Sequence, residues 1–177
     1  MKVLELFAGS RSVGKIAKEL GMEVFSSDLI EFEGIDYPIS ILDFDVTKVP
    51  FKPDIIWASP PCTGFSVAAI GHHWAGGKGA YIPKTDTARL GIELVKKTLE
   101  IINHFNPTYW FMENPRGVLR KLDVVKGLKK NSVTYCQYGD ERMKPTDIWT
   151  NSEVWAPRKM CKNGDPCHVA APRGSRT

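Results

Sequence analysis

Apolar runs typical of buried β-strands alternate with stretches of helical periodicity along this chain. The strand-like runs lie at residues 3–7, 24–27, 55–58 and 109–112. Helical stripes lie at residues 13–20 and 90–105, where apolar side chains recur at helical spacing. Strands separated by helices pair in parallel, and the helices then cover both faces of the sheet. The sequence therefore predicts an α/β fold with a mostly parallel sheet.

The remaining segments are less regular. Residues 132–137 and 147–150 predict two late strands that are close enough in sequence to be antiparallel neighbours. Residues 118–128 predict a helix. Residues 63–85 are rich in glycine and show no periodicity, which predicts a long loop. Loops of that length are usually functional or disordered.

The composition is that of a globular chain. Of the 177 residues, 42% are hydrophobic and 25% are charged, which suits one domain with one core. No apolar run reaches the ~18 residues of a membrane span, and the N-terminus lacks a signal-peptide pattern, so we expect a cytoplasmic protein. The net charge of +4 is compatible with a polyanionic partner. Four cysteines are too few for a disulfide scaffold and are expected to be thiols.

The chemically distinctive residues fall where the predicted strands end. They are Gly9, Asp28, Cys62 and Glu113. Turn chemistry explains each of them singly, but not their shared position. In parallel sheets, ligands bind beyond the carboxyl ends of the strands, so these positions predict one binding site at that edge.

A glycine-containing turn, residues 7–14, follows the first strand. Glycine allows the backbone to turn sharply there, and the next helix offers free N–H groups to an anionic group. Asp28 follows about 20 residues later, where an acid can bind ribose hydroxyls. A turn without a cofactor is the alternative, and Arg11 breaks the dinucleotide fingerprint by replacing its second glycine. Asp45, or less favourably Asp43, is a candidate acceptor for an adenine amino group, or else a solvated loop acid.

The sharpest signal is Pro60-Pro61-Cys62 directly after a buried strand. The two prolines stiffen the backbone and fix the direction of the next side chain, so the thiol is presented at the sheet edge. The alternative is that Cys62 is a small buried hydrophobe. Glu113 follows another apolar run, and partial desolvation would raise its proton affinity, as a proton donor requires. A salt-bridged structural glutamate is the alternative there.

Basic and metal-ligating residues gather late in the chain. Sequence alternation would place Arg142 and Lys144 on one side, unless they belong to an ordinary surface loop. Cys161, Cys167 and His168 are weak candidates for metal ligands. Their spacing is not a usual zinc pattern, and the fourth ligand, Cys136, is distant in sequence. We therefore expect no metal.

The order of these motifs resembles the cytosine-C5 DNA methyltransferase family, in a compact form similar to small phage- or prophage-borne members. Four blocks carry the resemblance: LELFAGSRSVG, SPPCTGFS, FMENPRG and YGDERMKPTDIW. The resemblance implies a Rossmann-like S-adenosylmethionine-dependent methyltransferase fold that acts on DNA in a bacterial or phage-infected cell. Catalytic roles would fall to Cys62, Glu113, Arg142 and Lys144. Cofactor contacts would fall to Phe7, Ala8, Gly9, Ser10, Gly14, Asp28, Asp45 and Pro60.

The chemistry implied is covalent catalysis. The Cys62 thiolate would add to C6 of a flipped-out cytosine while Glu113 protonates N3, and C5 would then accept the methyl group. The sequence departs from the family at Arg11, where glycine is usual, and at Pro115, where valine is usual. The large target-recognition region and the C-terminal segment beside the first strand are also lacking. We therefore assign residues 1–150 to a catalytic domain and 151–177 to an irregular basic segment that is truncated.

Three other functions fit parts of the pattern. An amino-methyltransferase also carries Pro-Pro after a central strand, but it needs an aromatic residue where Cys62 stands. A non-catalytic module that binds the cofactor or nucleic acid would tolerate the lacking segments. An RNA cytosine methyltransferase would use the same chemistry on another substrate. The oligomeric state stays open.

Overall fold

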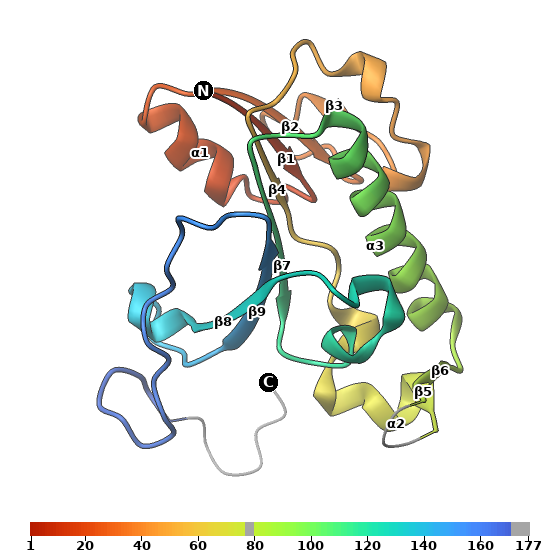
Figure 1. Cartoon of the computed structure of the whole chain (residues 1–177), viewed down its shortest axis with the longest axis vertical. Helices are drawn as coiled ribbons and strands as arrows, with labels where there is room; N and C mark the ends of the chain where they lie inside the picture. The colour runs from red at the N-terminus through yellow and green to blue at the C-terminus, as the bar shows by residue number, and fades with distance from the viewer. Residues whose placement is uncertain (77–79, 171–177) are drawn as a thin grey trace.

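The computed structural model describes residues 1–76 and 80–170, and its centre is a seven-stranded sheet with the order β3-β2-β1-β4-β7-β9-β8 (Figure 1). The strands are β1 (Lys2–Leu6), β2 (Glu23–Asp28), β3 (Tyr37–Pro38), β4 (Ile55–Ala58), β7 (Tyr109–Pro115), β8 (Lys130–Thr134) and β9 (Pro145–Thr150). The α-helices are α1 (Ser12–Glu19), α2 (Ile70–His73) and α3 (Asp86–Phe105). The short strands β5 (Trp74–Ala75) and β6 (Ile82–Pro83) pair separately.

Strand directions agree with the sequence. β1 pairs in parallel with β2 and β4, and β4 pairs in parallel with β7. β9 is antiparallel to both β7 and β8, because the short connection between β8 and β9 reverses the chain without a crossover. The predicted α/β class with an antiparallel late strand is confirmed, and β3 is an additional short strand.

Helices α1 and α3 lie on opposite sides of the sheet (Figure 1). The main core lies between the sheet and α3, and it includes Leu4, Ile56 and Met112 from the strands and Val95 and Ile101 from the helix. Side chains alternate between the two faces along a strand, so the neighbours of these strand residues point to the opposite face of the sheet. On that opposite face, α1 covers β1 and β2. Among the described residues, α1 therefore covers only the part of this face that β1 and β2 form.

Over β4 and β7, the α1 side of the sheet carries aromatic side chains. Trp57 stacks on Phe111 with ring centroids 5.8 Å apart, and Trp155 meets Phe111 edge-on at the same distance. Trp155 belongs to the irregular segment after β9. This segment, at residues 151–170, forms turns without helix or strand, and residues 171–177 lie outside the described part of the chain. The division into a catalytic domain and a C-terminal segment stays a prediction.

Residues 63–85 differ from the predicted loop. They contain two 3₁₀ turns (Thr63–Phe65 and Val67–Ala69), the helix α2 and the β5–β6 pair, while residues 77–79 lie outside the described part. Phe65 and Trp74 are both buried, and Trp74 Nε1 donates to the Gly64 carbonyl at 2.7 Å. Two anchored aromatic side chains order a stretch that has no periodicity of its own.

Two other predictions of local structure are wrong. Residues 118–128 form two 3₁₀ turns, Leu119–Lys121 and Asp123–Val125, instead of a helix. Buried Leu119, Leu122 and Val125 recur every three residues, which is the period of a 3₁₀ turn. The predicted strand at 132–137 ends at Thr134, and residues Tyr135–Tyr138 form the 3₁₀ turn η7.

No helix in residues 1–76 or 80–170 has the length and hydropathy needed to cross a membrane. The cytoplasmic location expected from the sequence stays a prediction.

Candidate active site

The turn after β1 has an unusual backbone. Phe7, Gly9 and Arg11 all have positive φ, at 56°, 50° and 60°. Such values are strained for residues with a side chain and are ordinary for glycine. A Cβ placed on Gly9 would meet no heavy atom within 4 Å, so this position requires glycine for its φ and leaves open space beside the backbone. Ala8 is buried, and Ser10 is exposed.

A buried acid that the sequence analysis did not identify lies beside this turn and accepts hydrogen bonds from the start of α1. Glu5 in β1 is 2% exposed and accepts hydrogen bonds from the Val13 N–H at 3.2 Å and the Ser26 hydroxyl at 3.1 Å. Burial raises the pKa of Glu5, although the N–H groups of Gly14 and Val13 oppose that rise. The sequence signal that could have identified Glu5 is a single acidic residue in the middle of an apolar strand.

Gly14 is required because α1 approaches β1 closely at this position. A Cβ at this position would lie under 3.0 Å from Glu5 Oε2 and 3.2 Å from Ser26 Oγ. The predicted role of Gly14 in shaping the turn therefore has a steric basis, because the helix can approach β1 only without a side chain there.

Asp28 and Gly9 are brought together. Asp28 Oδ2 accepts a hydrogen bond from the Gly9 N–H at 2.9 Å, and Oδ1 accepts one from the Ile30 N–H at 2.9 Å. The carboxylate thus ties the end of β2 to the glycine turn. Each oxygen keeps a second lone pair for another donor, such as a ligand hydroxyl.

Asp45 lies in a different place. It caps a 3₁₀ turn and accepts from both the N–H and the hydroxyl of Thr47, which holds the pKa of Asp45 below its usual range. It lines a polar cavity of about 330 Å³ whose other side is formed by the α3 residues Lys97, Glu100 and His104. Among the described residues, neither the glycine turn nor Asp28 lines this cavity.

Cys62 follows the end of β4 by four residues and is exposed, so it is not the buried hydrophobe of the alternative interpretation. Its loop is fastened to the neighbouring strand. Asn114 Nδ2 donates to the Pro60 carbonyl at 2.8 Å, and the Val118 N–H donates to the Phe65 carbonyl at 2.8 Å. Asn114, which the sequence interpretation missed, is buried and holds the Pro-Pro-Cys segment in place.

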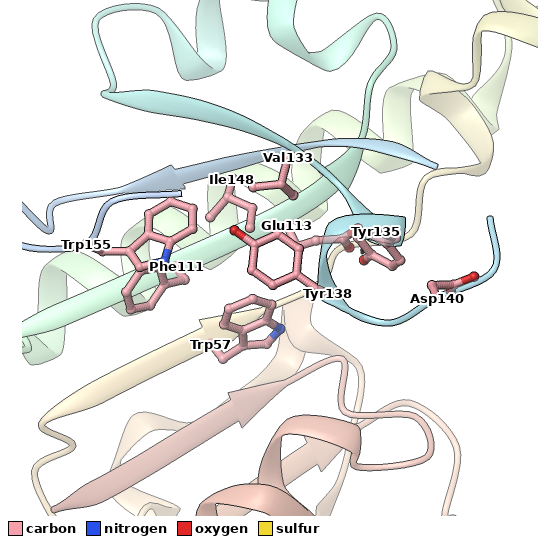
Figure 2. Close-up of a pocket in the computed structure, with 9 residues that line it drawn as sticks. All are labelled: Trp57, Phe111, Glu113, Val133, Tyr135, Tyr138, Asp140, Ile148 and Trp155. Carbon is pink, nitrogen blue, oxygen red and sulfur yellow. Dashed lines mark hydrogen bonds between the residues drawn. The ribbon is translucent and has the colours of Figure 1, made fainter. Parts of the chain in front are cut away.

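Glu113 lies one residue beyond Met112, which pairs with Ala58 at the end of β4. Its side chain points into the cavity beside Tyr135 (Figure 2). Glu113 is 8% exposed and accepts a hydrogen bond from the Tyr135 hydroxyl at 2.9 Å. Burial raises the pKa of Glu113, while Tyr135 and Lys144 oppose the rise. The expected increase in proton affinity agrees with this geometry, and Tyr135 is a partner that spacing did not reveal.

The two late cations have different surroundings. Lys144 Nζ lies 4.4 Å from the ring centroid of Tyr135, close enough to influence Glu113. Arg142 is 74% exposed and pairs with Asp140 through Nη2 and Oδ2 at 2.8 Å. The expectation that both cations lie on one side stays a prediction, and the backbone at Lys144 has a positive φ of 28°.

A cavity of about 500 Å³ surrounds Glu113 on the α1 side of the sheet (Figure 2). It is lined by Trp57, Phe111, Glu113, Val133, Tyr135, Tyr138, Asp140, Ile148 and Trp155. Cys62 is outside this lining within the described residues. Glu113 therefore lies at the border between an apolar cavity and the strand edge that carries the Cys62 loop.

The late cysteines form a cluster. Ligand atoms of Cys136, Cys161, Cys167 and His168 all lie within 4.8 Å of one another. Cys136, which is distant in sequence, joins the other three because the segment after β9 folds back against η7. The expectation that no metal is bound stays untested.

The profile of the family described as C-5 cytosine-specific DNA methylase matches residues 1–130. A Frog virus 3 (isolate Goorha) protein named "Probable DNA (cytosine-5)-methyltransferase" is 32% identical over 170 residues, which are 94% of this chain and 78% of that protein.

Two solved structures share the fold. One is described as a "putative DNA modification methyltransferase encoded within prophage" (E. coli), with a TM-score of 0.56, 16% identity and coverage of 85% of this chain and 46% of that one. The other is the S. pombe Dnmt2 methyltransferase, with a TM-score of 0.55, 13% identity and coverage of 89% and 52%. This chain spans about half the length of these two proteins.

Proposed function

Because this chain belongs to the C-5 cytosine-specific DNA methylase family, we propose that it transfers a methyl group from S-adenosylmethionine to C5 of a cytosine in DNA. One observation carries the proposal beyond family membership. A buried acid of raised pKa, Glu113, lies on the strand next to the one that presents the exposed thiol of Cys62. The proposed nucleophile and the proposed proton donor thus follow or end neighbouring strands at the same edge of the sheet.

The residues around the first turn fit S-adenosylmethionine. Asp28 already binds the Gly9 N–H, and its remaining lone pairs suit the ribose hydroxyls. The open space beside Gly9 allows a ligand to approach the backbone. In this proposal Phe7, Ala8, Gly9, Ser10 and Gly14 shape the pocket. When bound, the cofactor supplies an electrophilic methyl group.

Two proposed cofactor contacts have less support. The Asp45 carboxylate is engaged by Thr47 and lines a separate cavity, so its contact with adenine stays a prediction. The Pro60 carbonyl accepts from Asn114, and the contact of Pro60 with the cofactor also stays a prediction. The observed role of Pro60 is to hold the Cys62 loop against β7.

The chain's own residues would activate the base. The Cys62 thiolate adds to C6 of cytosine while the protonated Glu113 carboxyl donates to N3, which makes C5 nucleophilic. After methylation, loss of the C5 proton and departure of Cys62 restore the aromatic ring. Glu113 suits this role because burial raises the pKa of its carboxyl group and so favours the protonated form. Lys144, beside Tyr135, and Arg142 would lie near the base.

The test is trapping of the covalent intermediate. The full chain is incubated with S-adenosylmethionine and an oligonucleotide that contains 5-fluorocytosine, and the products are analysed by intact-mass and peptide mass spectrometry. We expect an adduct on Cys62 with DNA, no adduct with Cys62→Ala, and slower formation with Glu113→Gln. Undiminished methyl transfer by Cys62→Ala would overturn the mechanism. Adduct formation on the matched RNA alone would keep the chemistry and replace the substrate.

A further inference from the structure

Four potential metal ligands converge outside the proposed catalytic site. Cys136 lies in η7, directly after β8, whereas Cys161, Cys167 and His168 lie in the irregular segment that follows β9. The separations are 3.1 Å from Cys136 Sγ to Cys161 Sγ and 3.7 Å from Cys136 Sγ to Cys167 Sγ. His168 Nδ1 is 3.7 Å from the sulfurs of both Cys161 and Cys167.

These separations resemble the edges of a zinc tetrahedron. With Zn–S of about 2.3 Å and Zn–N of about 2.0–2.1 Å, tetrahedral ligands lie about 3.8 Å apart for two sulfurs and about 3.6 Å for sulfur and nitrogen. Three of the four separations given above are 3.7 Å, and all six pairs are within 4.8 Å. The donor atoms are therefore close enough together to serve as the ligands of one ion.

A disulfide explains this cluster less well. Bonded sulfurs lie about 2.05 Å apart, whereas those of Cys136 and Cys161 are 3.1 Å apart. A disulfide would also involve only two of the four groups, and it would not account for the sulfur of Cys167 and the ring nitrogen of His168 at the same point. Convergence of all four groups is what a metal ion requires.

We propose that Cys136, Cys161, Cys167 and His168 bind one zinc ion. Three thiolates and one imidazole form a complete ligand set typical of structural zinc. All four positions are taken by protein, so the ion has no place for a substrate. The thiols lose their protons on binding, which makes occupancy depend on pH and reduction.

The ion would fasten the segment after β9 to the stretch around η7. The contacts already present between them are hydrogen bonds and a cation–π contact between Arg158 and the ring of Tyr138. The Cys161 N–H donates to Thr134 Oγ1 at 3.1 Å, and the Val169 N–H donates to the Glu141 carbonyl at 2.8 Å. Short segments without an apolar core commonly depend on a metal for their fold.

The site also lies next to Glu113 in the fold. Tyr135, the residue before Cys136, donates the hydrogen bond to Glu113 at 2.9 Å. Trp155, in the segment that the ion would hold, lines the cavity around Glu113. If the proposed function is correct, zinc would keep Tyr135 in position. The zinc site itself does not depend on that function.

The experiment measures metal in the full chain purified under reducing conditions. Inductively coupled plasma mass spectrometry should find about one zinc ion per chain, since a closed four-ligand site binds tightly. Cys161→Ser and His168→Ala should each lower that content at least about tenfold. Cys62→Ser is the matched control, because it removes a thiol outside the cluster and should retain the metal.

A second measurement covers variants that fail to fold. The wild-type chain is stripped with a chelator and titrated with Co²⁺, which should produce the visible bands of tetrahedral cobalt and thiolate charge transfer, reversed by Zn²⁺. Absence of zinc together with absence of these bands would overturn the proposal. A disulfide between Cys136 and Cys161 in peptide maps of the alkylated protein would also overturn it. Neither result bears on the Cys62 adduct, so the two proposals fail separately.

Discussion

Replacing Gly14 by alanine tests how the glycine turn is built. Gly14 lies in the first turn of α1, where its Cβ would come under 3.0 Å from Glu5 Oε2 and 3.2 Å from Ser26 Oγ and Val24 Cγ1. The Glu5 carboxylate cannot withdraw freely, because it is buried and accepts hydrogen bonds from Val13 and Ser26. The added methyl group must therefore displace either the helix or the buried acid.

Two opposing effects set the magnitude. Alanine in a helix is favoured over glycine by about 1 kcal/mol. Overpacking of a tight site costs about 1–3 kcal/mol, and disturbing the hydrogen bonds of a buried carboxylate adds about 1–3 kcal/mol. The cost exceeds the gain, so we expect Gly14→Ala to lower the free energy of unfolding by about 1–5 kcal/mol. At this chain length each 1 kcal/mol lowers Tm by about 2–4 °C.

The assay is urea unfolding followed by far-UV circular dichroism, with Gly71→Ala as the control. Gly71 is also helical, but a Cβ there meets no heavy atom within 4 Å, so this variant should be neutral or slightly more stable. In a Glu5→Ala background the cost of Gly14→Ala should shrink or vanish, since the clashing group is gone. Equal stability of Gly14→Ala and wild type, or an unchanged cost without the Glu5 side chain, would refute this account.

Three further outcomes are expected. Burial raises the folded-state pKa of Glu113 above the ordinary 4.5, so ionisation of Glu113 costs stability as the pH rises through that raised value. Glu113→Gln should therefore be more stable than wild type towards pH 8 and lose this advantage below about pH 4.5. Urea unfolding at several pH values will check this. Tyr135→Phe removes a hydrogen bond that lowers the pKa of Glu113. The ionisation of Glu113 should therefore move to higher pH in single-turnover pH profiles. An unmoved profile would contradict the hydrogen bond between Tyr135 and Glu113. Asp147 is buried and pairs with Arg120 at 2.7 Å between Nε and Oδ2, while Lys130 Nζ lies 3.8 Å from its Oδ1. Arg120→Ala would leave Lys130 as the nearest cation, so it should destabilise the fold by up to about 3–5 kcal/mol in chemical denaturation, and a loss under about 1 kcal/mol would contradict burial of the charge.

The sequence alone determined the order of the main strands and of the helices α1 and α3, and it predicted the edge at which the distinctive residues lie. This worked because apolar periodicity reports which side chains are buried, and parallel strands bring their carboxyl ends together whatever the exact register. Gly9, Asp28, Cys62 and Glu113 could therefore be placed at one edge. The desolvation of Glu113 could also be inferred from the apolar run before it.

The spacing of apolar residues was insufficient where two kinds of secondary structure share the same spacing. Residues 119, 122 and 125 recur at a spacing that fits a helix or a 3₁₀ turn, and only their packing decided between them. Phe65 and Trp74 lie in a stretch without periodicity, so their burial, and the order it imposes on residues 63–76, could not be read from spacing.

Only the tertiary structure decided which groups meet. Glu5 supports Gly14, Tyr135 binds Glu113, and Cys136 joins Cys161 and its neighbours, although each pair is distant in sequence. Such contacts depend on strand register and on the path of the chain after β9, which place atoms to within an ångström. Spacing along a chain carries no information on that scale, because long-range contacts are set by the packing of the whole sheet.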